Sequence, residues 1–536
     1  MCESTSVGRS VRRSVLFLAA LGLAAEGVAA QDDMLVVTRG TDTIAVERVR
    51  RTGLRMDGEL LIPQARARFN YSVVIGPGAL VTQLENEFRR ADADVKSPPA
   101  QAASLQFVGD SVFVEIRNPG AAARTQRIKT REGALPYINP SFALLEPMLL
   151  RMRTLGKDSL QIPVFFVAGG QTVDVTIKYR GPDSVVVSFA PGNDSYLKVD
   201  RQNRILGGTV PSQGLSITRS RATGQALFMP KPDYSAPAGA PYTAVDVTIP
   251  TPMGHTLAGT LTLPSGKGPF PALVTITGSG SQDRDEEIAI VKGYRPFRQI
   301  ADTLARAGIA VLRMDDRGFG GSGGDVMTST SADFADDIKA GLAWLRQRPE
   351  IEGRRLGLVG HSEGGLIAPM IAAEDPTLAA IVIMAGPAQT GRQILTFQNR
   401  YAIERAPTIR PEARDSALGA ALKGIDSVAG TSPWIRFFLD YDPLATAARV
   451  KVPTLILQGA TDQQVTAEQA EALGQAIRSG GNGEVMVKVF PNANHLFVED
   501  PSGNPGGYAT LPTGQVRGDV IETLVSWLRG RLYPTR

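Results

Sequence analysis

One serine in the sequence stands where a nucleophile is expected. Residues 360–364 read Gly-His-Ser-Glu-Gly, and this G-x-S-x-G pattern is typical of a tight strand-to-helix turn that exposes a serine hydroxyl. The glycines suit such a turn because neighbouring backbone leaves little room for side chains. An apolar run precedes the motif and a helical pattern follows it. We therefore predict that Ser362 is a nucleophile, with a simple helix N-cap as the alternative.

The same pattern occurs again around Ser322, at residues 320–324. No apolar strand runs directly into this copy and no helical pattern follows at once, so it lacks the required context. Residues 318–323 also spell G-x-G-x-x-G, but polar residues separate them from the preceding strand and no helix follows. We interpret the stretch as a flexible loop and predict no dinucleotide cofactor.

A nucleophilic serine needs a base to take its proton and a third group to orient that base. Of the three histidines, His361 adjoins Ser362 and should point away from its hydroxyl, while His255 lies in a turn far upstream. His495 follows the last strand, where the chain order serine, acid, histidine requires the base. His495 is therefore the predicted base.

The predicted acid is Asp462, in the loop that follows an apolar strand at residues 453–457. This position satisfies the same chain order. A purely structural Asx turn is the alternative for this residue. The weaker candidates for the acid are Asp440, Asp442 and Glu499.

Two backbone N–H groups should stabilise the negative charge that develops on the substrate oxygen. One is predicted from Glu363, the residue after the nucleophile. The other is predicted from Ser279, in the glycine-rich loop after the strand at residues 272–277. A glycine-rich loop without this role is the alternative. We predict neither a metal site nor a cofactor.

The elements that must position these residues form a β-α-β series from residue 242 to residue 536. A hairpin opens it, and helical patterns separate apolar strands at residues 272–277, 309–314, 356–359, 380–384, 453–457 and 485–490. This alternation predicts a mostly parallel, doubly wound sheet. No strand is evident at about 387–450, which we interpret as a helical cap over the edge where Ser362 stands.

Two charged groups, at residues 283–285 and 315–317, follow neighbouring strands of this sheet. Two interpretations stay open. The groups pair and brace the elbow from below, or they are separately solvated.

Residues 31–229 are predicted to form a separate β-rich domain. Short β-branched and aromatic runs, several alternating with period two, indicate a curved antiparallel sheet. One helical pattern follows Asn139-Pro140, with Pro147 expected to kink it. The domain is interpreted as a structural or substrate-restricting accessory, with lipid or glycan binding as the alternative. A stiff Pro/Ala linker follows at residues 230–241.

The first 30 residues have the layout of a secretory signal peptide. Arg9, Arg12 and Arg13 precede an apolar core, and Val28-Ala29-Ala30 suits cleavage. We expect a periplasmic or secreted bacterial protein without an integral membrane segment after cleavage, and without Cys2, the one cysteine. The net charge of +4, which becomes +3 when the signal and its charge of +1 are removed, is too near neutral to indicate binding to nucleic acid or to a membrane surface. The oligomeric state is not predicted.

With these residues placed, residues 243–533 resemble the α/β-hydrolase superfamily. Four motifs resemble bacterial secreted serine esterases related to the serine aminopeptidase and monoacylglycerol-lipase group. They lie at 277–285, 315–322, 360–365 and 432–434. Two features depart from that pattern, since Thr277-Gly278 stands where many members have His-Gly and Pro369 falls in the nucleophile helix.

The resemblance implies hydrolysis of carboxylic esters through an acyl-enzyme, with Ser362, Asp462 and His495 at the triad positions. The expected substrate is a small-molecule ester with a small to medium acyl chain. Two alternatives stay open. One is an aminopeptidase or amidase that uses the same triad, and the other is a hydrolase fold that serves only for binding.

Overall fold

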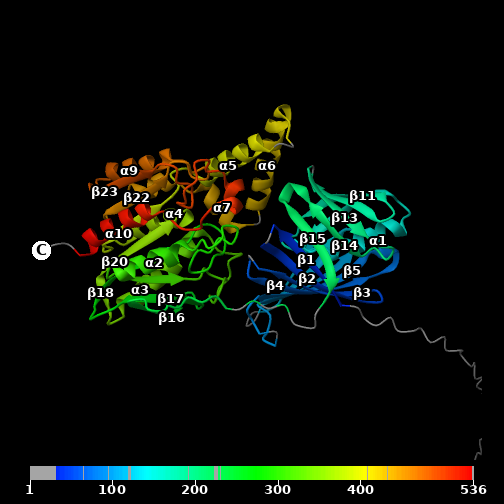
Figure 1. Cartoon of the computed structure of the whole chain (residues 1–536), viewed down its shortest axis with the longest axis horizontal. Coiled ribbons are helices and arrows are strands. Elements are labelled where there is room, and N and C mark those ends of the chain that lie inside the picture. Colours follow the sequence, from blue (N-terminus) through cyan, green and yellow to red (C-terminus); the bar gives the residue numbers. More distant parts are fainter. Residues whose placement is uncertain are drawn as a thin grey trace, which may run out of the picture. The chain divides into compact units, whose positions relative to one another are not determined.

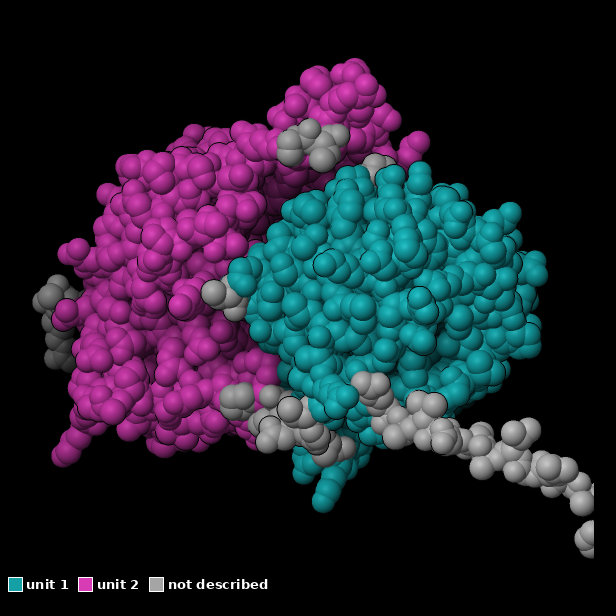
Figure 2. All heavy atoms as spheres, turned by 45° about the vertical axis from the view of Figure 1, so that its right-hand side comes forward, with its two compact units in different colours: residues 1–63, 67–228 teal, residues 64–66, 229–536 magenta. Residues whose placement is uncertain are grey.

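The computed structural model describes residues 32–40, 42–63, 65–94, 96–118, 122–190, 192–222, 227, 229, 231–406, 409–430 and 432–533. The predicted signal peptide therefore lies outside the described residues. The chain divides into two compact units, residues 1–63 with 67–228, and residues 64–66 with 229–536 (Figure 2). Residues 231–241, in the predicted linker, contain no helix or strand.

The N-terminal unit is built on one sheet of fifteen strands. Their spatial order is β8-β7-β6-β5-β4-β3-β2-β1-β15-β14-β13-β12-β11-β10-β9. Neighbours pair antiparallel except β9 and β10, which are parallel. The bounds are β1 Asp32–Arg39, β2 Asp42–Thr52, β3 Arg55–Ile62, β4 Ala67–Ile75, β5 Val81–Arg90, β6 Gln101–Val108, β7 Ser111–Arg117, β8 Arg124–Lys129, β9 Leu135–Tyr137, β10 Ser159–Phe166, β11 Thr172–Gly181, β12 Ser184–Ala190, β13 Asn193–Val199, β14 Ile205–Val210 and β15 Leu215–Arg221.

The sheet packs against the single α-helix described in this unit, α1 (Glu146–Thr154). Fifteen strands laid flat would span about 65 Å, far more than the about 10 Å width of one helix. Yet Met148, Leu149 and Met152 of α1 belong to the same buried cluster as residues from strands across the sheet. The sheet must therefore curve to bring these strands to one helix, which Figure 1 labels within this unit.

The predicted helix thus exists, but its predicted start was wrong. It begins at Glu146, so that Pro147 lies in its first turn, where the missing N–H has no intrahelical partner to lose. The expected kink at this proline is therefore absent.

The C-terminal unit contains an eight-stranded sheet in the order β16-β17-β19-β18-β20-β21-β22-β23. The first three strands pair antiparallel and the remaining neighbours pair parallel. The central strands are short apolar runs buried on both faces, as parallel strands require. The bounds are β16 Tyr242–Pro250, β17 Thr256–Pro264, β18 Phe270–Ile276, β19 Ala310–Met314, β20 Ile351–His361, β21 Ala380–Met384, β22 Thr454–Gly459 and β23 Val485–Phe490.

Helices cover both faces of this sheet (Figure 1). One face packs against α3 (Ser331–Arg346), α4 (Glu363–Glu374) and α9 (Glu468–Ser479). The other packs against α2 (Pro296–Arg306) and α10 (Gly518–Leu532). This is the predicted α/β-hydrolase architecture, which follows a β-rich N-terminal domain along the chain, and the fold-class prediction is confirmed.

Between β21 and β22 the chain is helical. The segment contains α5 (Gly391–Arg405), α6 (Arg414–Ala429), α7 (Pro433–Asp440) and α8 (Pro443–Ala447). The segment interpreted as a cap is therefore helical.

Pro369 lies inside α4, which continues to Glu374 without a break. The helix that follows the nucleophile therefore accommodates this proline.

Candidate active site

Ser362 lies at a strained turn between β20 and α4. Its φ of 54° and ψ of −115° fall in a region that residues other than glycine rarely adopt. A Cβ on Gly360 would collide with the carbonyl oxygen of Gly364, and one on Gly364 would collide with that of Ile276. The two glycines of the motif are therefore required by close backbone approach. Ser362 itself stays partly exposed.

The structure brings the predicted acid and base together. Asp462 Oδ2 lies 2.7 Å from Nδ1 of His495. Its other oxygen accepts the backbone N–H groups of Gln464 at 2.7 Å and Val465 at 2.9 Å, and the Gln458 amide donates to Oδ2 at 2.9 Å. Four donors thus fix a carboxylate that is 2% exposed. The fixed carboxylate holds the imidazole with a proton on Nδ1 and leaves Nε2 for another partner.

The side chain of His361, the residue before Ser362, contacts the backbone of the base, His495. Its Nε2 donates to the carbonyl oxygen of His495 at 2.9 Å, and the two rings have centroids 5.0 Å apart. The backbone of the base is therefore held by the residue that precedes Ser362. Within the described residues, no hydrogen bond joins Ser362 Oγ to the His495 ring; such bonds often tighten only when substrate binds.

Glu286 is a component of the site that the sequence analysis missed. It is fully buried, and its Oε1 lies 2.7 Å from Nδ1 of His361 and accepts the Gly278 N–H at 2.8 Å. Burial alone would lower the pKa of His361, but Glu286 raises it above its ordinary value. The only signal in the sequence is the run of five charged residues at 283–287, which does not reveal the partner.

The two predicted oxyanion donors lie beside the serine. A Cβ on Gly278 would come within 3.2 Å of the Ser362 Cβ, so the loop carrying Ser279 lies against the elbow. Gly278 itself donates to Glu286. In the described part of the chain, the N–H groups of Ser279 and Glu363 have no acceptor. No hydrogen bond within the described residues therefore occupies either N–H group.

The charged groups beyond β18 and β19 pair with each other. Arg284 donates from Nε and Nη2 to the two oxygens of Asp315, each at 2.9 Å. Arg317 binds Asp337, which also lies 2.9 Å from Nε2 of His255. Of the two open interpretations, pairing is therefore the observed one. His255 therefore pairs with Asp337, which agrees with its exclusion from the predicted triad.

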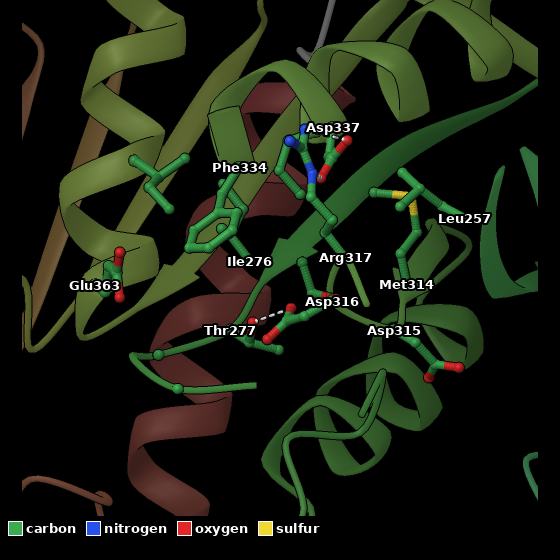
Figure 3. Close-up of a pocket in the computed structure, with 15 residues that line it drawn as sticks. Leu257, Ile276, Thr277, Met314, Asp315, Asp316, Arg317, Phe334, Asp337 and Glu363 are labelled. Carbon is green, nitrogen blue, oxygen red and sulfur yellow. Dashed lines mark hydrogen bonds and ion pairs between the residues drawn. The ribbon is translucent and has the colours of Figure 1, made fainter. Parts of the chain in front are cut away.

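A cavity of about 40 Å³ lies next to the elbow (Figure 3). Its wall combines apolar side chains with polar ones, among them Leu257, Ile276, Met314, Phe334, Thr277, Asp316 and Glu363. Thr277 donates to Asp316 at 2.6 Å. Burial raises the pKa of both carboxyl groups, Asp316 and Glu363, above their ordinary values.

A second cavity, of about 370 Å³, lies between α5 and the loop that follows Asp462. Its wall is rich in carboxamides and includes Gln398, Tyr401, Arg405, Gln463, Gln464 and Asn504. The Gln398 amide donates to the Gln464 carbonyl oxygen at 3.1 Å. This contact joins the cap to the loop that carries the acid.

The described residues contain no group of three or more His, Cys, Asp or Glu side chains that could hold a metal ion. None of their helices is both long enough and apolar enough to cross a membrane.

Comparison with known proteins agrees with the architecture. Residues 254–497 match the model of the S15 family, X-Pro dipeptidyl-peptidase. Esterase EstD of Thermotoga maritima is 28% identical over 309 residues, which are 55% of this chain and 69% of that protein. Dipeptidyl aminopeptidase BIII of Pseudoxanthomonas mexicana is 25% identical over 53% of this chain and 40% of its own length.

Solved structures give a more distant likeness. The Pyrococcus furiosus esterase Pf2001 is 19% identical, covers 58% of this chain and 98% of its own, and has a TM-score of 0.38. Hypothetical protein PA2218 of Pseudomonas aeruginosa is 16% identical, covers 57% of this chain and all of its own, and has a TM-score of 0.40.

Proposed function

The C-terminal unit is a hydrolase of the α/β-hydrolase superfamily, and from this premise we propose that it cleaves carboxylic esters of small to medium acyl chains. Ser362 is the nucleophile, His495 the base and Asp462 the group that orients the base. The single observation that carries the proposal is the bond between Asp462 Oδ2 and His495 Nδ1 at 2.7 Å, on the loops that follow the last two strands. A buried carboxylate so placed favours one imidazole tautomer and stabilises the imidazolium.

Acylation follows from this geometry. Ser362 Oγ attacks the ester carbonyl carbon while His495 Nε2 takes the hydroxyl proton. The carbonyl oxygen becomes an oxyanion and accepts the N–H groups of Ser279 and Glu363. When the C–O bond to the alcohol breaks, His495 returns its proton to the departing oxygen. An acyl group then remains on Ser362.

Deacylation reverses the roles with water as the nucleophile. His495 takes a proton from the water, whose oxygen attacks the acyl carbon, and the same two N–H groups hold the second oxyanion. The proton returns to Ser362 Oγ as the carboxylic acid leaves. No step requires a metal ion or a cofactor.

The test combines covalent labelling with turnover. Wild-type protein should react with a fluorophosphonate probe and hydrolyse p-nitrophenyl acetate and butyrate, whereas Ser362→Ala should do neither. Equal turnover by the alanine variant would contradict the proposal. An intact Ser362 that no acylating probe labels would instead favour a fold used only for binding.

An aminopeptidase or amidase activity on the same triad is the second candidate. The match to the S15 dipeptidyl-peptidase model and the similarity to dipeptidyl aminopeptidase BIII favour it. Aminoacyl or dipeptidyl naphthylamides should be compared with p-nitrophenyl esters on the same preparation. A higher kcat/KM for the naphthylamides would make the amide reaction the principal one.

The location proposed for the enzyme is the periplasm or the medium. The basic and apolar layout of residues 1–30 supports this proposal. N-terminal sequencing of protein from the periplasmic fraction should begin at Gln31. Retention of residues 1–30 on protein in the cytoplasmic fraction would contradict it.

A further inference from the structure

The side chain of Glu363 has a partner in the cap. Glu363 follows Ser362 directly and is only 4% exposed. Its Oε1 accepts two hydrogen bonds, from Ser331 Oγ at 2.6 Å and from Trp434 Nε1 at 2.7 Å. Ser331 is the first residue of α3 and Trp434 belongs to α7. One carboxyl oxygen thus joins the nucleophile helix to a core helix and to a cap helix.

The cap helices differ in how they are held to the core. Of the described residues, α6 has none that is buried, α5 has Gly391 and Ile394, and α8 buries three of its five residues. In α7, Phe437 and Phe438 pack against the hydrophobic core of the catalytic unit. The Trp434 ring stacks on Phe438, with centroids 5.5 Å apart and an interplanar angle of 3°. Helix α7 therefore adds to the attachment that α8 makes, and Trp434 supplies the polar contact of α7 with the elbow.

The hydrogen bond from Trp434 to Glu363 can break at moderate cost to the carboxyl. A buried carboxyl that loses all its donors is strongly destabilising, but here the Ser331 hydroxyl remains bonded when Trp434 withdraws. The indole ring also keeps its stacking partner on α7. The pair of donors therefore allows the Trp434 hydrogen bond to break while the Glu363 carboxyl stays bonded to Ser331.

We propose that Glu363 is a positioning residue that docks the cap on the nucleophile elbow through the Trp434 hydrogen bond. The inference rests on the proposed function, because the docked residue also carries the N–H assigned to the oxyanion. Its side chain therefore links the position of the cap to the direction of that N–H. Docking completes the wall around the bound ester, and release opens the route to Ser362.

The first test is Trp434→Phe, which removes the N–H donor and keeps an aromatic ring on Phe438. A hydrogen bond to a charged group contributes enough for about a tenfold effect. We expect KM for p-nitrophenyl butyrate to rise about tenfold while kcat falls less than about threefold. The control is Trp344→Phe, the same substitution at the far end of α3, which should leave both constants within about twofold. An unchanged KM in Trp434→Phe would overturn the proposal.

The second test is a double-mutant cycle. Glu363→Leu removes the acceptor and keeps the backbone N–H, so kcat/KM should fall at least as far as in Trp434→Phe. Adding Trp434→Phe to Glu363→Leu should cause no further loss, because both changes remove the same bond. If the losses of kcat/KM in the two single variants multiply in the double variant, the two substitutions do not act on one shared hydrogen bond.

A third variant, Glu363→Gln, distinguishes the loss of the hydrogen-bond acceptor from any other effect of replacing the Glu363 side chain. Glu363→Gln keeps a carbonyl oxygen that can accept from both donors, so it should recover most of the KM defect of Glu363→Leu. A glutamine variant as impaired as the leucine variant would overturn the role of the acceptor. Fluorophosphonate labelling accompanies each variant, because a small probe should still react with Ser362 when the cap is undocked. Failure of the wild type to label would instead contradict the proposed function.

Discussion

Each unit of the molecule buries a carboxylate among several donors, but the two arrangements serve different ends. In the N-terminal sheet, Glu47 accepts hydrogen bonds from the hydroxyl groups of Tyr71 at 2.6 Å and Ser141 at 2.5 Å. It also accepts the backbone N–H groups of Phe142 and Ala143. None of these donors has a second atom placed to react with a substrate. The carboxylate therefore has a structural role and joins strand β2 to the segment that leads into α1.

Asp462 is as thoroughly bonded, but one of its donors is a ring with a second functional atom. Three donors fix its position, and the fourth, His495 Nδ1, orients an imidazole whose Nε2 can take a proton. The comparison teaches that a saturated buried carboxylate does not by itself mark an active site. Function requires a partner that keeps a reactive atom free, next to a nucleophile held at a strained turn.

The largest expected effect is that of Asp462→Asn. The amide keeps the shape but favours the wrong imidazole tautomer, so kcat should fall about 10⁴-fold with little change in the folded structure. Ester hydrolysis and circular dichroism of the same sample measure both quantities. Asp440→Asn, at the exposed end of α7, is the control and should remain within about twofold. A similar loss in both variants would refute the assignment of the acid.

The counterpart in the N-terminal sheet is Glu47→Ala. It leaves the donors on Tyr71, Ser141, Phe142 and Ala143 without an acceptor, so the free energy of unfolding should fall by about 3 kcal/mol. Denaturant titration should locate this loss in the transition of the N-terminal unit. Hydrolysis at low temperature, where both units are folded, should be unchanged. A catalytic defect in folded protein would break the distinction between the two carboxylates.

A smaller effect is expected for Glu286→Gln. One oxygen of Glu286 serves both His361 and Gly278, and a neutral amide removes the charge that raises the pKa of His361. The backbone contact from His361 to His495 should weaken, and kcat should fall about tenfold. Glu287→Gln, one residue on and outside this contact, is the control. Equal activity of the two variants would remove Glu286 from the site.

The smallest effect concerns pH and again contrasts the units. Burial raises the pKa of Glu47 above its ordinary value even though its donors oppose the shift. A raised pKa means that stability is present at low pH and is lost as pH rises through the folded-state pKa. Relative to Glu47→Gln, wild-type protein should therefore lose stability as pH rises from the ordinary pKa range of a glutamate to the raised pKa of Glu47. A rise in relative stability over this range would contradict the sign.

The strands and the order of the triad could be predicted because they depend on local patterns. Short apolar runs flanked by helical periodicity indicate buried parallel strands, and the motif around Ser362 carries its own strand and helix. With only three histidines, elimination reached His495. The fold-class and superfamily predictions are confirmed, while the roles of the site residues remain predictions that the experiments above test.

The contacts of Glu286 and Trp434 could not be predicted, because nothing in the neighbouring sequence of either residue indicates its partner. Glu286 sits in a run of charges in which each member had the same chance of being solvated. Trp434 belongs to a motif that supported the family resemblance, but its hydrogen bond crosses 71 residues to Glu363. The pairing of Arg284 with Asp315 was likewise left open, because a sequence does not give the separation of two charged groups.

The sequence by itself determined the β-α-β alternation, the elbow and the chain order of serine, acid and base. These features depend on periodicity, on glycines at fixed spacing and on connectivity, all of which are local. Only the tertiary structure decided which carboxylate meets which donor. Glu286 at His361 and Glu363 at Trp434 depend on how loops and helices from distant segments converge at one edge of the sheet. The physical reason is that a buried charge is tolerated only where donors from several segments meet, and that meeting is a property of packing.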